Sequence, residues 1–217
     1  MSEHALGEDD VAESRLALRR AHLRCLAFRD PVDRREHLAL VLGEVTDGED
    51  VLVRVHSECV TGDVFGALRC ECGDQLHAAL DRVIAEGRGV LVYLRGHEGR
   101  GIGLLDKVRT MSLQDRRGLD TVDSATALGL PVDVRDYAPA ARILRHQSVR
   151  SIRLLSNNPD KVLALQDHGI KVTARLPLLA EAHTDNIDYL TAKRDRLGHD
   201  LPHLDHSPGS GADDTRD

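Results

Sequence analysis

Apolar runs of strand length alternate with amphipathic segments of helical length along most of this 217-residue chain. Residues 89–94 have the pattern of a buried strand, and residues 74–86 repeat apolar side chains at helical spacing before Gly87. Further strands are predicted at 37–42, 51–55, 152–155 and 170–176, and further helices at 104–115 and 159–168. Such alternation is typical of α/β folds, and a predicted hairpin of the first two strands makes the sheet mixed. We therefore predict one α/β domain with helices flanking a mixed β-sheet.

Composition predicts where this domain begins and ends. Residues 1–13 carry five acidic side chains and no Lys or Arg, and residues 200–217 are rich in Ser, Gly and Asp. Polar, charged segments without hydrophobic periodicity are typical of disorder. We predict disordered acidic tails at 1–13 and 200–217 around a folded domain of residues 14–199. Without these tails the formal net charge changes from −7 to +2, so the domain itself is nearly neutral.

Composition also excludes several classes of protein. The chain has three Tyr, two Phe and no Trp, whereas binding of single-stranded nucleic acid by base stacking needs aromatic faces. No apolar stretch approaches the roughly 20 residues of a membrane span, and the first 20 residues lack the pattern of a signal peptide. We therefore expect a cytoplasmic protein that binds neither nucleic acid nor a membrane. In a reducing compartment, clustered cysteines more often bind metal or do chemistry than form disulfides.

Three of the four cysteines lie close together in the sequence, at Cys59, Cys70 and Cys72. Three thiolates suit Zn²⁺, and three protein ligands leave one coordination position for water, as in catalytic zinc sites. Zinc lowers the pKa of that water and so supplies a nucleophile. Two alternatives stay open. His56 would complete a closed structural site as a fourth ligand, or the cysteines would be small buried hydrophobes.

Two segments between a predicted strand and a predicted helix are suited to bind an anion. Residues 95–103 contain four glycines and two arginines, so that main-chain amides and positive charge can approach a phosphate. Residues 156–161, which end at Lys161, lie at the start of another predicted helix. Tight-turn formation and ordinary helix capping are the alternatives for these two segments.

Asp133 and Arg135 form a third candidate. On a strand these two residues share one face, which places a carboxylate for proton transfer beside a guanidinium for phosphate. By spacing alone a solvated ion pair is the simpler interpretation. Together with the zinc candidate, however, the three segments indicate a phosphorylated small substrate that is attacked by metal-activated water.

Six blocks of the sequence, in order, resemble one enzyme family. They are RVHSECVTGDVFGALRCECGDQL (54–76), RGHEGRGIGL (95–104), LQDRRGLDTVD (113–123), VDVRDY (132–137), RLLSNNPDK (153–161) and YLTAKRDRLGH (189–199). These blocks are similar to those of GTP cyclohydrolase II, a zinc enzyme that opens the imidazole ring of GTP in riboflavin biosynthesis. The resemblance extends from about residue 37 to residue 199 and implies the fold of that family.

The resemblance implies a role for each matching residue. Cys59, Cys70 and Cys72 match the zinc ligands, Asp133 matches the acid/base, and Arg135 matches the Arg of the phosphoanhydride step. The nucleotide-binding positions are matched by Arg54, Val55, His56, Ser57, Glu58, Gln75, Glu98, Gly99, Arg100, Thr121, Ser156 and Lys161. Among them the loop with Glu98 and Arg100 is implied to hold the triphosphate, and Ser156 replaces the usual Thr. The resemblance also implies Mg²⁺ with the triphosphate and a homodimer.

The implied reaction has three steps. Zinc-activated water adds to C8 of guanine, and ring opening leaves a formamide. A second attack of water at the same carbon expels formate. Separately, cleavage between the α and β phosphates releases pyrophosphate. The usual product is 2,5-diamino-6-ribosylamino-4(3H)-pyrimidinone 5′-phosphate.

Met111 departs from the family pattern, which has a Tyr at this position. Helical spacing alone gives Met111 an apolar stripe with Leu104 and Val108, where Met usually fills a core. The resemblance instead places Met111 at the reacting carbon, where a thioether cannot replace the hydrogen bond of a phenol. We therefore predict ring opening and pyrophosphate release with the formyl group retained. The alternatives are the ordinary reaction with formate release, and a zinc-stabilised GTP-binding protein without turnover.

Overall fold

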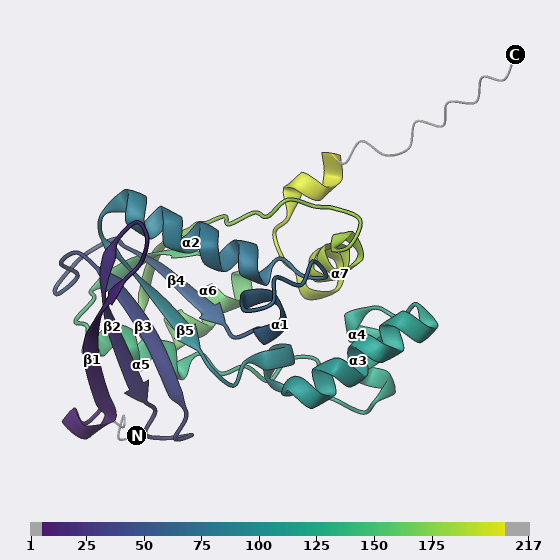
Figure 1. Ribbon diagram of the computed structural model, residues 1–217, viewed down its shortest axis with the longest axis horizontal. Coiled ribbons are helices and arrows are strands. Elements are labelled where there is room, and N and C mark those ends of the chain that lie inside the picture. The colour runs from purple at the N-terminus through teal and green to yellow at the C-terminus, as the bar shows by residue number, and fades with distance from the viewer. Residues whose placement is uncertain (1–5, 207–217) are drawn as a thin grey trace, which may run out of the picture.

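The computed structural model describes residues 6–206, and residues 1–5 and 207–217 lie outside this description. A seven-stranded sheet in the order β1-β2-β3-β5-β4-β6-β7 forms its body (Figure 1). The strands are β1 (Val11–Ala17), β2 (His22–Arg29), β3 (Glu36–Leu42), β4 (Val51–Ser57), β5 (Gly89–Leu94), β6 (Ser151–Leu155) and β7 (Lys171–Leu176). The predicted α/β class and mixed sheet are confirmed.

The sheet has an antiparallel half and a parallel half. Strands β1, β2, β3 and β5 pair antiparallel in succession, whereas β5, β4, β6 and β7 are parallel. The hairpin predicted from residues 37–42 and 51–55 is wrong, because β5 lies between β3 and β4. Every residue of β4 except Ser57 is buried, as expected for a central strand with both faces covered.

Helices cover both faces of the sheet. They are α1 (Val60–Asp63), α2 (Cys72–Glu86), α3 (Leu104–Arg117), α4 (Thr121–Ala127), α5 (Ala138–His146), α6 (Pro159–Asp167) and α7 (Ile187–Leu197), with 3-10 turns η1 (Glu8–Asp10), η2 (Glu98–Gly101) and η3 (Pro202–His206). Helix α2 buries Val83 in a cluster with Leu52 and Leu91. On the other face α5 buries Ile143 with Val53, which alternates with Leu52 along β4. No helix among residues 6–206 is long and apolar enough to cross a membrane.

The folded region extends past both predicted ends. Strand β1 begins at Val11, which pairs with Phe28, so the predicted start at residue 14 is too late. Glu13 belongs to this strand and accepts hydrogen bonds from Arg24 at 2.7 and 2.8 Å, so the acidic composition marks an exposed strand. At the other end, Leu201 and Leu204 are buried with α7, so residues 200–204 are not part of a tail. Residues 1–5 and 207–217 of the predicted tails lie outside the described residues.

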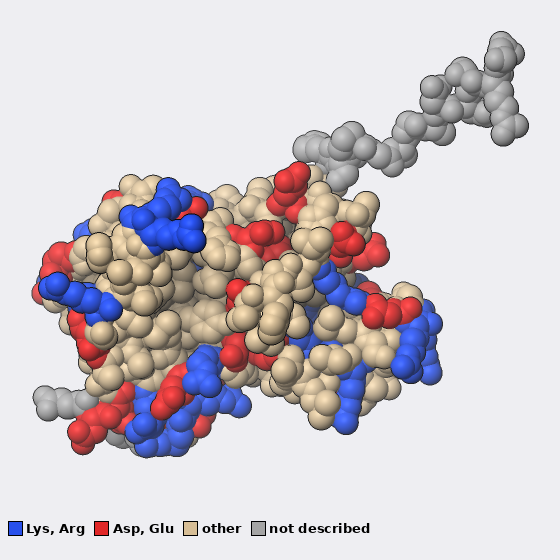
Figure 2. Space-filling view, in the orientation of Figure 1, with Lys and Arg blue, Asp and Glu red and all other residues tan. Residues whose placement is uncertain are grey.

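Strands β4, β5 and β6 end at one edge of the sheet, and the segments that follow them meet there. Residues 58–72 follow β4, the Gly-rich segment 95–103 follows β5, and residues 156–158 follow β6. Crevices beyond the carboxyl ends of parallel strands are the usual binding sites of open α/β sheets. On the face seen in Figure 2, Lys and Arg are interspersed with Asp and Glu and do not form one large basic surface.

Candidate functional site

A cleft of about 1270 Å³, which includes space open to solvent, lies at this edge of the sheet. Most residues predicted for the site line it: Arg54, His56, Ser57, Glu58, Cys59, Cys70, Cys72, Gln75, Glu98, Gly99, Arg100, Met111, Thr121, Arg135, Ser156 and Lys161. Val55 and Asp133 do not line the cleft. Instead, the Val55 carbonyl accepts a hydrogen bond from Lys161 Nζ at 2.8 Å, and Asp133 pairs with Arg135.

The three predicted metal ligands converge where α1 meets the start of α2. Their sulfur atoms all lie within 4.8 Å of one another, and the Sγ atoms of Cys59 and Cys70 are 3.8 Å apart. Two thiolates at about 2.3 Å from a tetrahedral Zn²⁺ would be about 3.8 Å apart, so the cluster fits this ion. Among residues 6–206, no Asp, Glu or His completes the group, which leaves the three-ligand arrangement.

Two glycines allow α1 and α2 to approach closely enough to form this cluster. A Cβ atom at Gly62 would lie 3.0 Å from Cys70 Sγ and 3.4 Å from Cys59 Sγ. A Cβ atom at Gly73 would lie 2.5 Å from the carbonyl oxygen of Gly62. A side chain at Gly62 would therefore fill the space between the thiols, and one at Gly73 would push the two helices apart.

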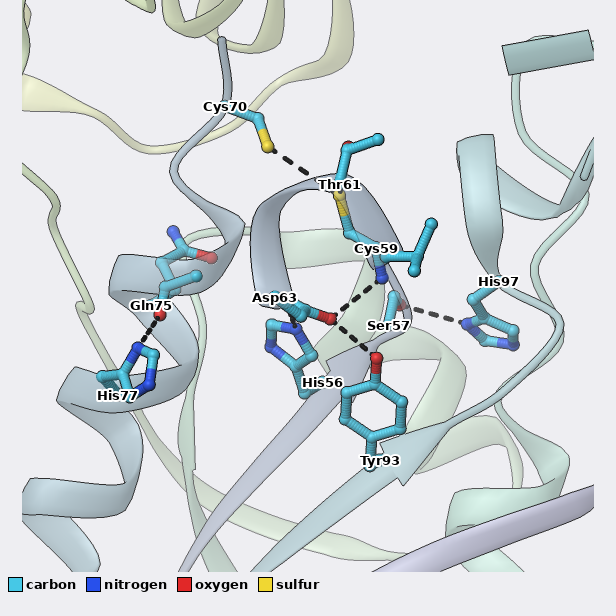
Figure 3. Close-up of polar contacts among 12 residues, drawn as sticks. His56, Ser57, Cys59, Thr61, Asp63, Cys70, Gln75, His77, Tyr93 and His97 are labelled. Atoms are coloured by element: carbon cyan, nitrogen blue, oxygen red, sulfur yellow. Dashed lines mark hydrogen bonds and ion pairs between the residues drawn. The ribbon is translucent and has the colours of Figure 1, made fainter. Parts of the chain in front are cut away.

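His56 does not join the cluster as a fourth ligand. Its Nε2 lies 3.0 Å from Asp63 Oδ1, and its ring stacks on Tyr93 at 5.4 Å (Figure 3). Asp63 Oδ2 accepts hydrogen bonds from the Cys59 amide at 3.0 Å and from the Tyr93 hydroxyl at 2.8 Å. Burial and Asp63 raise the pKa of Tyr93, so its hydroxyl stays a donor. Asp63 thus fixes the main chain of Cys59, and the closed four-ligand alternative is not formed.

Lys107 on α3 contacts the first of the three cysteines. Its Nζ donates a hydrogen bond to Cys59 Sγ at 3.2 Å. Hydrogen bonds with Cys70 and Cys72, and then the charge of Lys107, lower the pKa of the Cys59 thiol. The hydrogen bond with Cys59, together with burial, raises the pKa of Cys70 to about 11. Cys59 is therefore more readily ionised than Cys70. We call these cysteines, with Asp63, Glu98 and Lys107, the metal wall.

Five cationic side chains form a second wall, which we call the cationic wall: Arg54, Arg100, Arg135, Lys161 and Lys193. Burial, and then the charge of Arg54, holds the pKa of Lys161 well below its usual range. Within the described chain, Arg54 Nε and Arg100 Nη2 are buried without a hydrogen-bond partner. Unpaired buried donors are costly, and an anionic ligand would satisfy them. The cationic wall is therefore suited to a phosphorylated ligand.

Asp133 and Arg135 lie in an irregular segment before α5 and not on a strand. The two side chains still pair, since Arg135 Nε is 2.9 Å from Asp133 Oδ1 and 3.1 Å from Oδ2. Burial opposes ionisation of Asp133, but the hydrogen bonds and charge of Arg135 prevail and lower its pKa. An ionised carboxylate is suited to accept a proton. The Arg135 side chain, 14% exposed, reaches the cleft.

The Gly-rich segment 95–103 forms η2 and turns sharply at Gly99 and Arg100, both with left-handed φ values near 60°. Arg100 Nη1 donates to Thr121 Oγ1 at 3.0 Å, and its guanidinium lies 5.8 Å from the Tyr189 ring. Glu98 accepts hydrogen bonds from the Val60 amide at 2.7 Å and from Lys107 Nζ at 2.6 Å. Glu98 therefore connects the main chain just after Cys59 to the side chain of Lys107.

Met111 lines the cleft, but the apolar stripe predicted for it is not buried. Leu104 and Val108 on the same helix are 49% and 50% exposed. Sequence reasoning missed several other residues that line the cleft, including Lys107, Tyr189 and Lys193. Lys107 lies one helical turn before Met111, and this helical spacing could have predicted that both side chains face the cleft. Lys193 pairs with buried Glu71, and its Nζ lies 5.4 Å from the Tyr189 ring.

The fold and cleft define an α/β protein with a three-cysteine cluster suited to hold a metal, and comparison with known proteins gives its family. The GTP cyclohydrolase II family model matches residues 9–177. The chain is 52% identical over 217 residues to the riboflavin biosynthesis protein RibBA of Mycobacterium ulcerans, covering 95% of this chain and 51% of that protein. It is 56% identical over 189 residues to RibBA of Salinispora arenicola, covering 87% and 45%. The chain belongs to the GTP cyclohydrolase II family, and it spans about half the length of these curated relatives.

A comparison with solved structures gives a partial match. It is RibBX from A. baumannii, a two-domain 3,4-dihydroxy-2-butanone 4-phosphate synthase, with a TM-score of 0.41 and 20% identity. The match covers 81% of this chain and 42% of that one. The family assignment depends on the sequence comparisons and not on this overlap.

Proposed function

We propose that this chain hydrolyses GTP at C8 of the guanine, opens the imidazole ring and releases pyrophosphate. One observation carries the proposal: a three-thiol metal cluster and a wall of buried cations line the same cleft. The first supplies a site for hydrolytic chemistry and the second a site for a triphosphate. Membership of the GTP cyclohydrolase II family supports this substrate.

Cys59, Cys70 and Cys72 would hold Zn²⁺, which when bound lowers the pKa of a water molecule and makes it nucleophilic near neutral pH. Asp63 and Lys107 hold Cys59 in place through its amide and its sulfur. Arg135 keeps the Asp133 carboxylate ionised, and the Asp133 oxygens would receive the proton that is transferred.

The cationic wall would bind the phosphates. Arg100 and Arg135 offer guanidinium donors to phosphate oxygens, and Lys161, held by the Val55 carbonyl, contributes a further charge. Arg135 would stabilise the charge that develops as the bond between the α and β phosphates breaks. Mg²⁺ bound with the triphosphate, and assembly as a homodimer, are further parts of this proposal that follow from the family.

The fate of the formyl group is a separate question. The RibBA relatives favour the ordinary reaction, in which formate leaves. Met111 favours the second candidate, in which the product keeps its formyl group, because the thioether that lines the cleft donates no hydrogen bond. Loss of one transition-state donor slows a step by about 10²- to 10³-fold. On this ground we propose that ring opening and pyrophosphate release persist while formate release is impaired.

Product analysis tests both candidates. The zinc-loaded protein is incubated with GTP and Mg²⁺, and pyrophosphate, formate and product mass are measured. Pyrophosphate with little formate, and a product heavier by the formyl group, supports retention. Equal amounts of formate and pyrophosphate would establish the ordinary reaction. Release of neither product would leave the alternative of GTP binding without turnover.

Substitution of Met111 locates the cause of retention. We expect Met111→Tyr to increase the rate of formate release by about 10²- to 10³-fold, because it introduces a phenol donor into the cleft. Met111→Leu, which changes the side chain without adding a donor, is the matched control and should not increase formate release. If Met111→Tyr releases no more formate than Met111→Leu, another residue limits this step.

A further inference from the structure

Lys107 is a partly buried cation that contacts the cysteine cluster and not the cationic wall. Its Nζ lies 3.2 Å from Cys59 Sγ, 2.7 Å from Thr61 Oγ1 and 2.6 Å from Glu98 Oε1. An ammonium group has three protons, so these three contacts use all of its donors. The side chain is 15% exposed. Lys107 therefore has no donor left for a phosphate, although it lines the cleft.

Glu98 connects Lys107 to the main chain of the metal site. While one carboxylate oxygen binds Lys107, the other accepts a hydrogen bond at 2.7 Å from the amide of Val60, the residue after Cys59. Cys59 is thus held through its sulfur by Lys107 and through the next amide by Glu98. Gly99 makes this approach possible, because a Cβ atom there would lie 2.9 Å from Lys107 Cβ.

The charge of the cluster explains why a cation belongs there. Three thiolates would leave a bound divalent ion with a net charge of about −1. An ammonium in contact with one sulfur offsets part of this charge. Groups that hydrogen-bond to metal ligands orient them and tune the metal, and their loss typically costs about 10- to 100-fold in metal affinity or activity.

We propose that Lys107 is a positioning residue of the metal site, which holds Cys59 Sγ in ligating geometry and draws charge from its sulfur. Glu98 acts through Lys107 and connects the metal ligand to the Gly-rich segment that carries Arg100. This inference rests on the metal site of the proposed function. It adds that the metal site and the phosphate-binding segment are positioned by one shared ion pair.

Zinc affinity and a cobalt spectrum test this role without measuring turnover. Native protein, Lys107→Met and Lys107→Arg are compared by competition with a chromophoric zinc chelator, and again after loading with Co²⁺. We expect Lys107→Met to bind zinc about 10- to 100-fold more weakly. Its thiolate-to-cobalt charge-transfer band should move to longer wavelength, because a sulfur without the hydrogen bond donates electrons more readily. Lys107→Arg keeps a charged donor and should restore most of both properties.

Arg142→Met is the matched control. Arg142 is similarly buried, at 14% exposure, and pairs with buried Asp30 through its Nε at 2.8 Å, with no contact to the cysteines. It should lower stability without changing zinc affinity or the cobalt band. Glu98→Gln keeps an acceptor for the Val60 amide but weakens the ion pair with Lys107. It should change zinc affinity and the cobalt band by less than Lys107→Met does. If Lys107→Met does not fold, Glu98→Gln replaces it in the test.

Two results would overturn the proposal. One is a folded Lys107→Met protein with native zinc affinity and a native cobalt band. The other is an equal change in Arg142→Met, which would assign the effect to general loss of stability. Native protein that binds no zinc would refute the metal site itself. Native zinc affinity with no reaction on GTP would refute the proposed activity while leaving the role of Lys107 intact.

Discussion

The two walls of the cleft differ in how far the protein satisfies its own polar groups. In the metal wall, both carboxylate oxygens of Asp63 and of Glu98 and the ammonium of Lys107 are paired. In the cationic wall, Arg54 and Arg100 keep buried nitrogens without a partner in the described chain. The metal wall is thus organised by the protein alone, whereas the cationic wall is complete only with an anion.

This difference has an energetic meaning. Charges that are fully hydrogen-bonded within the protein hold the cysteines in place before any ligand arrives. The unpartnered buried nitrogens of Arg54 and Arg100 raise the free energy of the protein, and a bound anion recovers that energy. Substitutions in the metal wall should therefore change zinc binding, and substitutions in the cationic wall should change reactions of the triphosphate.

The largest effect is expected for Arg135→Met. In the proposed function this substitution removes a donor to the transition state of phosphoanhydride cleavage, so pyrophosphate release should fall by about 10²- to 10³-fold. Zinc affinity should stay native, because Arg135 contacts Asp133 and no cysteine. Pyrophosphate release and chelator competition measure the two properties, with Arg150→Met at an exposed ion pair as control. Loss of zinc affinity in Arg135→Met would show that the two walls are not independent.

A smaller effect is expected for Gly62→Ala. The added methyl group meets Cys70 Sγ at 3.0 Å, so the thiols must separate, and zinc should bind about tenfold more weakly. Gly66→Ala separates this crowding from backbone strain. Gly66 has a left-handed φ of 63°, and its new Cβ would meet nothing within 4 Å. This control should lose stability but not zinc affinity, and equal loss of zinc in both variants would contradict the crowding argument.

The local elements of this fold were predictable, whereas the order of the strands was not. The apolar run 89–94 and the helical spacing before Gly87 gave β5 and α2, because burial patterns depend on nearby residues. Strands β3 and β4 are neighbours in the sequence, yet β5 pairs with both of them. Strand pairing is a long-range property, and the hydrophobic period of a strand carries no information about its partner.

The site shows the same limit. Closely spaced cysteines indicate a metal site from spacing alone, and the structure brings all three together. The contacts of Glu98 depend instead on the left-handed turn at Gly99 and Arg100, which directs its carboxylate to Val60 and Lys107. The resemblance assigns Glu98 to the phosphate loop, and residue types do not show in which direction a short turn points its side chains.

The protonation of His97 depends on its burial and on the positive charge of the cationic wall. Burial, with the charges of Arg135 and Lys161, lowers its pKa to about 3. The ring is buried as a neutral imidazole. Its Nε2 donates to the Asp136 carbonyl at 3.0 Å, and its Nδ1 accepts from Ser57 Oγ at 3.0 Å. A histidine in the unfolded state has a pKa of about 6.5. As pH falls from about 6.5 toward about 3, the unfolded state therefore binds a proton that the folded protein does not.

The smallest effect is therefore expected in stability. The contribution of neutral His97 to the free energy of unfolding is fully present above a pH of about 6.5 and is lost as pH falls toward about 3. Between pH 7 and pH 5 this loss is about 2 kcal/mol. Urea unfolding of zinc-loaded native protein and His97→Asn at both pH values measures it. The variant should lose less free energy of unfolding than the native protein by about this amount, because Asn takes up no proton. Equal losses in the two proteins would mean that burial beside the cationic wall does not hold His97 neutral.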